Sequence, residues 1–86
     1  MTGQEPRDRT GVVDRFGDTW VRMDGTDSYG SWWPITDGPG WEEWGRNKVG
    51  SPRPWDQVAP NYGPFQPASP ERTQRGIELV LAEIAR

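Results

Sequence analysis

The sequence predicts a small α+β domain with an antiparallel sheet of three to four strands, tryptophan-rich loops and one C-terminal amphipathic helix. Short runs of β-favouring residues alternate with turn signals between positions 12 and 36. The chain of 86 residues holds 6 tryptophans but only 13 valines, isoleucines, leucines and phenylalanines. Because each aromatic side chain buries roughly 150–250 Å², tryptophan must supply much of the core.

The first two predicted strands, Val12–Arg15 and Asp18–Met23, would pair as a hairpin. Gly17 lies between them and can adopt the positive φ that a tight turn needs. In the second strand Trp20 points to one face and Val21 to the other. Since tryptophan buries far more area than valine, we expect Trp20 to face the core.

A third predicted strand, Ser31–Thr36, follows a longer turn that begins at Asp24. Pro34 has no N–H to give to a ladder, so this strand is expected at an edge of the sheet or to end early. The next turn begins at Asp37, in an Asp-Gly-Pro-Gly sequence.

Trp41 and Trp44 stand three residues apart between Gly40 and Gly45. The glycines disfavour a long helix, so we expect an irregular segment or a short strand that lays one tryptophan over the sheet. The alternative is an exposed aromatic platform for a sugar, a base or a peptide.

The segment around Trp55 predicts one capped helical turn. Ser51 would be the N-cap, Pro52 the first helical residue, and Pro60 would end the turn. Trp20, Trp55 and Phe65 are assigned to the core. Tyr62 is a further aromatic anchor in the turn that follows.

The C-terminal segment predicts the clearest helix, with Ser69 as N-cap and Pro70 as first helical residue. Glu71 and Arg75 form an i, i+4 pair, and Gly76 either weakens the helix or permits a close approach. An isolated helix of this length is marginal in water, so its apolar stripe must be buried. We expect it on the chain's own sheet, with a second copy of the chain as the alternative that the off-stripe Leu79 keeps open. The stripe consists of Ile77, Val80, Leu81 and Ile84.

The chain therefore divides into a flexible lead-in, a tryptophan-rich β domain and a helix. Their predicted ranges are 1–10, 11–68 and 69–86. The lead-in is polar and charged, which favours a loosely attached segment.

Composition argues against several classes of function. The chain has no cysteine and no histidine, so thiolate and imidazole ligands are lacking, and we expect no metal and no cofactor. No apolar run is long enough to span a membrane or to act as a signal core, so we expect a location in the cytoplasm of a bacterial host. We assign the carboxylate pairs to solvated turns and expect no enzyme. These pairs are Asp14 with Asp18, Asp24 with Asp27, and Glu42 with Glu43.

Four segments carry a resemblance: Asp14–Arg22 with its Asp-x-x-Gly-Asp-x-Trp pattern, Gly30–Trp33, Pro54–Val58 and Tyr62–Phe65. In these the chain resembles a set of small proteins from actinobacteria and their bacteriophages, largely of unassigned function. The resemblance covers positions 12 to 65 and implies a phage or prophage accessory protein, without a mechanism. The chain departs from the pattern in the insertion 37–51 and in its long C-terminal helix.

Three hypotheses of function follow. The first is a non-catalytic protein-interaction module that binds and modulates a host protein, with a partner-binding set of Trp32, Trp41, Trp44, Glu42 and Glu43. The second is a single-stranded nucleic-acid binding protein that uses Arg46, Lys48 and Arg53, which the net charge of −3 disfavours. The third is a self-associating virion component, a homodimer formed through Ile77, Val80, Leu81 and Ile84.

Overall fold

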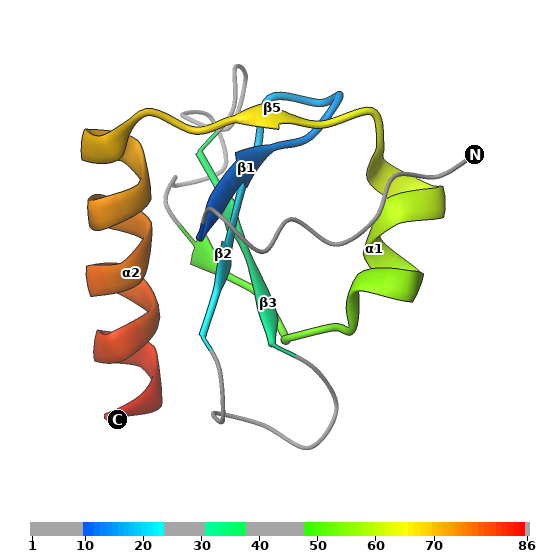
Figure 1. Ribbon diagram of the computed structural model, residues 1–86. Coiled ribbons are helices and arrows are strands. Elements are labelled where there is room, and N and C mark those ends of the chain that lie inside the picture. Colours follow the sequence, from blue (N-terminus) through cyan, green and yellow to red (C-terminus); the bar gives the residue numbers. More distant parts are fainter. Residues whose placement is uncertain (1–9, 24–30, 38–47, 86) are drawn as a thin grey trace.

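The computed structural model describes residues 10–23, 31–37 and 48–85. Within these ranges the elements follow in the order shown in Figure 1. They are β1 (Gly11–Val13), β2 (Thr19–Arg22), β3 (Trp32–Thr36), β4 (Lys48–Val49), α1 (Trp55–Tyr62), β5 (Gln66–Pro67) and α2 (Pro70–Ile84).

The described strands form one antiparallel sheet in the order β4-β3-β2-β1-β5. The longer strands β1, β2 and β3 lie in the middle, and each outer strand contributes two residues. The first hairpin has the predicted pairing, with Val12 opposite Trp20. Gly17 has a φ of 90° in its turn, the left-handed region that favours glycine. The predicted α+β fold is confirmed.

Pro34 does not place β3 at the edge of the sheet, because β4 lies beyond it. The backbone N–H of Gly50 donates to the carbonyl of Pro34 at 2.9 Å, so the nitrogen of Pro34 also faces the β4 side. The two-residue β4 ladder pairs only with Ile35 and Thr36, so the missing N–H falls where that ladder has already ended. A proline is tolerated in the strand for this reason.

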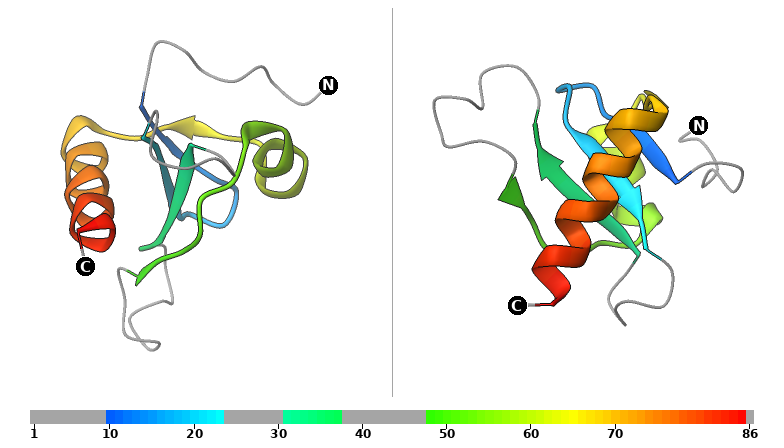
Figure 2. Two further views of the ribbon diagram at one scale, coloured as in Figure 1. Left: turned by 90° about the horizontal axis from the view of Figure 1, so that it is seen from below. Right: turned by 90° about the vertical axis from the view of Figure 1, so that its left-hand side faces the viewer.

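A helix packs against each face of the sheet, with α1 on one side and α2 on the other (Figures 1 and 2). Trp20 faces inward as predicted, but its neighbour Val21 is equally buried on the opposite face. The expectation of a single core face was therefore wrong. The α1 side is mainly aromatic and the α2 side is richer in aliphatic residues. Their buried residues are, respectively, Val12, Trp20, Trp32 and Val58, and Val21, Trp33, Ile35 and Val80.

Helix α1 differs from its prediction at both ends. It begins at Trp55 after Pro54, whose side chain supplies no capping bond, so the Ser51 cap and the Pro52 start are wrong. It also continues past Pro60 to Tyr62. Its buried residues Val58 and Ala59 pack against the sheet. Tertiary packing of this kind stabilises a helix that local propensity would end.

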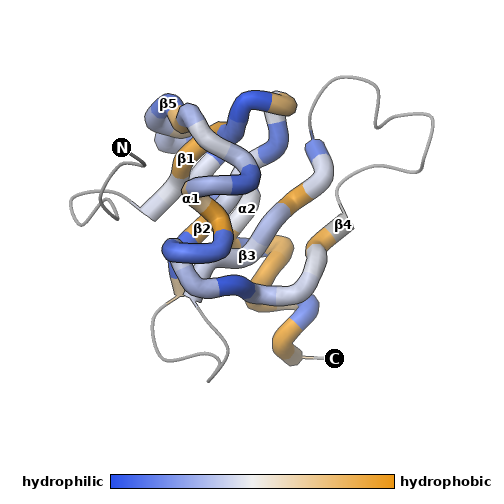
Figure 3. Tube along the Cα trace, turned by 90° about the vertical axis from the view of Figure 1, so that its right-hand side faces the viewer, coloured by the Kyte–Doolittle hydropathy of each residue, from blue (hydrophilic) through white to orange (hydrophobic). Residues whose placement is uncertain are grey.

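Helix α2 has the predicted start: Pro70 is its first residue, and the Ser69 hydroxyl accepts from the N–H of Arg72 at 3.2 Å. It docks on the chain's own sheet, as we expected. Gly76 and Val80 are the buried residues of the helix, whereas Leu81 and Ile84 are 51% and 45% exposed. The buried face is thus rotated from the predicted stripe. Figure 3 shows hydrophobic segments along the strands and near the C-terminal end of α2.

Gly76 provides a test of this packing. A Cβ at this position would lie 2.8 Å from Cγ1 of Val21 and 3.0 Å from Cδ1 of Ile35. We predict that Gly76→Ala lowers the free energy of unfolding by about 1–3 kcal/mol, because overpacking outweighs the gain of about 1 kcal/mol in helix propensity. Urea unfolding followed by circular dichroism measures the change. In the control Ala82→Gly, at an exposed site, propensity alone should lower stability. A Gly76→Ala protein more stable than the wild type would contradict the close approach.

Candidate functional site

A cleft of about 290 Å³ opens on the α1 side of the sheet. Trp20 and Pro34 are cross-strand partners in β2 and β3, and Thr36 lies on the same face two residues further along β3. The other lining residues come from the first hairpin turn, from the segment after β4, and from the last residue of α1. The full lining is Asp14, Asp18, Trp20, Pro34, Thr36, Gly50, Ser51, Arg53 and Tyr62.

The apolar wall of the cleft is part of a row of aromatic rings. The Tyr62 ring lies 5.0 Å from that of Trp20 and 6.3 Å from that of Phe16, the latter pair edge-on at 78°. Phe16 is 56% exposed, and the Arg15 guanidinium carbon lies 4.9 Å from the centre of its ring. The row therefore leads from the protein surface to the wall of the cleft.

Hydrogen bonds hold the hairpin turn against the end of α1. The N–H of Arg15 donates to the carbonyl of Tyr62 at 3.1 Å, and its guanidinium donates to the carbonyl of Gly63 at 3.3 Å. Two elements that are distant in the sequence are thereby fixed to each other. This fixes the position of the Tyr62 ring, as a preformed binding site requires.

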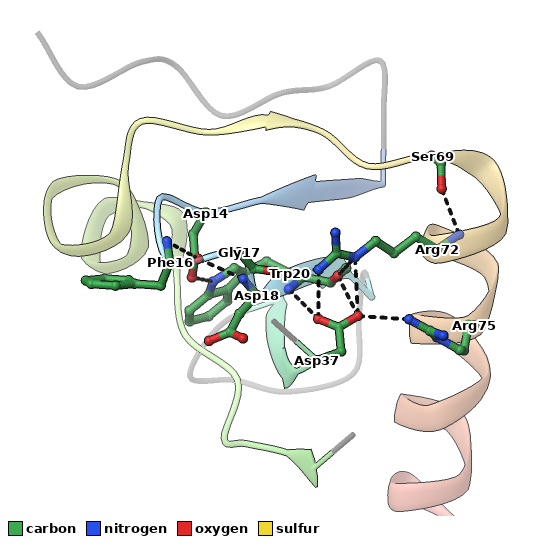
Figure 4. Close-up of polar contacts among 10 residues, drawn as sticks. Asp14, Phe16, Gly17, Asp18, Trp20, Asp37, Ser69, Arg72 and Arg75 are labelled. Atoms are coloured by element: carbon green, nitrogen blue, oxygen red, sulfur yellow. Dashed lines mark hydrogen bonds and ion pairs between the residues drawn. The ribbon is translucent and has the colours of Figure 1, made fainter. Parts of the chain in front are cut away.

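Asp14 organises the turn beside the cleft (Figure 4). Its Oδ1 accepts from the backbone N–H groups of Phe16 and Asp18 at 2.9 and 3.0 Å, and its Oδ2 accepts from the Trp20 indole Nε1–H at 2.8 Å. The residue is 6% exposed. All three donors are neutral, so within the described part of the chain this buried carboxylate has no cationic partner.

A polar rim completes the cleft through Thr36, Ser51 and Arg53. Arg53 is held by its backbone, which exchanges hydrogen bonds with Trp32 at 3.1 and 2.9 Å. Its position is exposed, so the guanidinium is accessible at the cleft. The lining thus combines two carboxylates, one guanidinium, two aromatic rings and a proline.

Asp37, just after β3, forms a second polar cluster (Figure 4). Its Oδ1 accepts from the Thr19 N–H at 3.0 Å and from Arg72 at 3.1 Å. Its Oδ2 accepts from the Thr19 hydroxyl at 2.9 Å and from Arg75 at 3.2 Å. Arg75 therefore reaches Asp37, and its predicted pairing with Glu71 is wrong. This cluster joins α2 to the sheet.

The pKa of Asp37 reflects this setting. Burial by itself raises the pKa, but hydrogen bonds from Arg72 and Thr19 and the positive charge of Arg72 outweigh burial, so the pKa lies below its ordinary value. The side chain is 3% exposed. The role that follows is a structural ion pair, because a proton donor or acceptor near neutral pH needs a pKa shifted the other way.

The predicted partner-binding residues include one that is buried and several that lie outside the described residues. Trp32 is completely buried and its ring lies 4.9 Å from that of Trp55, so it cannot contact a partner and that prediction is wrong. The predicted core residues Trp20, Trp55 and Phe65 do pack in the α1-side core, as expected. The remaining predicted anchors and one basic residue lie outside the described residues: Trp41, Glu42, Glu43, Trp44 and Arg46.

The residues of the nucleic-acid and self-association hypotheses are also only partly brought together. Of the nucleic-acid set, Lys48 pairs with Thr36 in the sheet through its backbone, and the side chain of Lys48 lies outside the described part. Arg53 lines the cleft. Trp55, the tryptophan nearest to Arg53 in the sequence, packs against Trp32 and Phe65. Of the self-association set, Ile77 and Val80 pack against the sheet, and Leu81 and Ile84 remain exposed.

Sequence reasoning missed the cleft and the role of Asp14. An aspartate whose side chain accepts from the backbone two residues ahead is a known turn device, so the Asp-x-x-Gly-Asp sequence did carry a signal for it. The approach of Tyr62 to Trp20 joins positions 42 residues apart in the chain, and no local pattern indicates it.

Comparison with protein-family models, with curated proteins and with solved structures gives no significant match. Among the described helices, none is long and apolar enough to cross a membrane. The described residues contain no group of three or more acidic side chains arranged to hold a metal ion.

The Asp37 cluster predicts a loss of stability in acid. Since the folded-state pKa is lowered, its stabilising effect is complete above the unfolded-chain value of about 3.9 and is lost as the pH falls through the folded-state pKa. Asp37→Asn should lower the free energy of unfolding at neutral pH by about 1–3 kcal/mol. Between about pH 5 and pH 2 the free energy of unfolding should fall less steeply with pH in this variant than in the wild type. Urea titrations at several pH values measure both effects. Asp56→Asn, at an exposed site on α1, should lose stability with falling pH as the wild type does. The same pH dependence in Asp37→Asn would refute the role of Asp37 as a structural ion pair.

Proposed function

We propose that the protein is a non-catalytic interaction module that holds a short extended segment of a partner protein in the cleft. The observation that carries this proposal is the composition of the lining: an aromatic and proline wall facing a polar rim, on residues fixed by the sheet and by α1. Aromatic grooves with a few polar groups are typical of peptide recognition. The resemblance to phage and actinobacterial proteins suggests a phage or prophage accessory protein whose partner is a bacterial host protein.

The roles of the buried carboxylates favour binding over catalysis. Asp14 is occupied by three N–H donors of its own hairpin. Asp37 is paired with Arg72 and Arg75 on the opposite side of the sheet. Both side chains stabilise the fold in these arrangements, and the cleft retains surfaces suited to contact and hydrogen bonding.

Exposed aromatic surface next to the cleft extends the proposed interface. Phe16 packs against the ring of Tyr62, so a segment lying in the cleft can continue across Phe16. Aromatic residues are enriched at interface hot spots because they bury large areas at low entropic cost. We also propose Trp41 and Trp44 as anchors, because tryptophan is enriched at interface hot spots.

A blocking substitution tests the module. Ser51 is exposed and lines the cleft, so Ser51→Trp should obstruct it without removing a core contact. Peptides selected from a random linear library for binding to the wild type should lose at least about 10-fold in affinity for Ser51→Trp. Gln74→Trp, on the exposed side of α2, supplies the matched control and should bind like the wild type. Failure to select any peptide, or equal affinity for Ser51→Trp, would exclude this use of the cleft.

Leu81 and Ile84 support self-association as a second candidate function, because both are exposed large apolar residues on one helix. We predict that a Leu81→Glu/Ile84→Glu protein sediments as a monomer with unchanged circular dichroism, whereas the wild type forms dimers at high concentration. Sedimentation velocity over a range of concentrations measures this. A wild type that stays monomeric at millimolar concentration would rule it out.

A further inference from the structure

We infer that the cleft selects an arginine side chain of the partner segment. This inference rests on the proposed function and adds the chemical identity of the anchoring residue. Three features carry it: a buried carboxylate whose hydrogen-bond donors within the described residues are all neutral, a partly exposed aromatic ring beside it, and a volume that suits one long side chain.

The charge distribution of the two buried aspartates is the first feature. Asp37 is held by the guanidinium groups of Arg72 and Arg75. Asp14 is buried to a similar extent, but its donors are the amides of Phe16 and Asp18 and the indole of Trp20. Asp14 borders the cleft and is 6% exposed, so a cation in the cleft would interact with its negative charge with little screening by water. Its Oδ2 accepts one hydrogen bond and has a lone pair for a further donor.

The aromatic ring is the second feature. Tyr62 is partly exposed and packs against Trp20, and it borders the same cleft as Asp14 and Asp18, so a cation there would meet carboxylates and a ring surface together. Guanidinium groups bind both kinds of partner, since they stack on rings and donate to carboxylates in a fixed planar geometry. The molecule already contains one such contact in the same aromatic row, where the guanidinium of Arg15 lies over Phe16.

Size and the position of Arg53 complete the argument. A volume of about 290 Å³ holds one extended side chain and excludes a large cofactor. Arg53 adds a positive charge to a lining that also carries the carboxylates of Asp14 and Asp18 and would repel a second guanidinium. The incoming guanidinium must therefore approach the side formed by Asp14, Asp18 and Tyr62. Arg53 is then placed to donate to backbone carbonyls of the bound segment. Phosphate groups would meet the two carboxylates, which disfavours nucleic acid.

Short capped peptides test the inference. Four peptides of the form acetyl-Gly-Ala-X-Ala-Gly-amide, with arginine, lysine, citrulline or leucine at X, are titrated into the full chain labelled with ¹⁵N. The reporter is the Trp20 Nε1–H resonance, because this group donates to Asp14. We expect saturable shifts with the arginine peptide and affinity at least about 10-fold weaker with citrulline, which has the same shape without the charge. Equal affinity for arginine and citrulline, or tightest binding of leucine, would overturn the inference.

Two variants assign the effect to the cleft. Asp18→Asn removes a carboxylate of the lining and should reduce the preference for arginine over citrulline several-fold. Glu71→Gln removes the same charge from α2, on the opposite face of the sheet, and should leave the preference unchanged. A loss of preference in Glu71→Gln equal to that in Asp18→Asn would show a general charge effect and overturn the inference.

The outcome also separates this inference from the proposed function. Selected peptides that lack arginine and yet lose binding to Ser51→Trp would overturn the choice of arginine and leave the peptide-binding module standing. A ten-nucleotide thymidine strand that shifted the Trp20 resonance more strongly than the arginine peptide would overturn both.

Discussion

The structure depends on the burial of β2 from both sides. Trp20 and Val21 are neighbours in this strand, so their side chains point to opposite faces, and both are almost inaccessible to solvent. A sheet of this kind needs a cover on each face. The chain meets this need with few aliphatic residues by using aromatic rings under α1 and mostly aliphatic side chains under α2. The three-layer arrangement in Figure 2 follows from this constraint.

The cleft forms because the two helices cover their faces of the sheet to different extents. Helix α2 has 15 residues and packs along the sheet, with Gly76 allowing close contact, whereas α1 has 8 residues. The shorter helix leaves the face around Pro34 and Thr36 open beside Tyr62. A small core that relies on large rings therefore leaves one of them, Tyr62, partly exposed at the wall of the cleft.

The sequence allowed prediction of features that local chemistry determines. The Gly17 turn, the Ser69 cap and the docking of α2 on its own sheet all follow from dihedral freedom, capping and amphipathicity. The start of α1 was mispredicted because Ser51 and Pro52 suit a helix start, yet tertiary packing begins the helix at Trp55. The two-sided burial of the sheet was missed because alternation of apolar and polar residues, as around Trp20, is typical of a strand with one buried face.

The candidate site could not be predicted from the sequence, because its residues come from segments that are far apart in the chain. Its geometry joins a hairpin turn, two strands and the end of α1, and the Asp37–Arg72 pair likewise joins positions 35 apart. Charge patterns along a chain do not reveal which buried carboxylate receives a cation. Only the folded structure shows that Asp37 is matched by arginines while Asp14 receives neutral donors.

The two proposed surfaces occupy different layers of the fold. The cleft opens on the α1 side of the sheet, and Leu81 and Ile84 belong to α2 on the other side. Self-association through α2 would therefore leave the cleft open, and a dimer would present two clefts to a partner. Two linked clefts raise the apparent affinity for a partner with repeated segments, because the second binding event becomes intramolecular. A weak preference for a single side chain can in this way support a specific interaction.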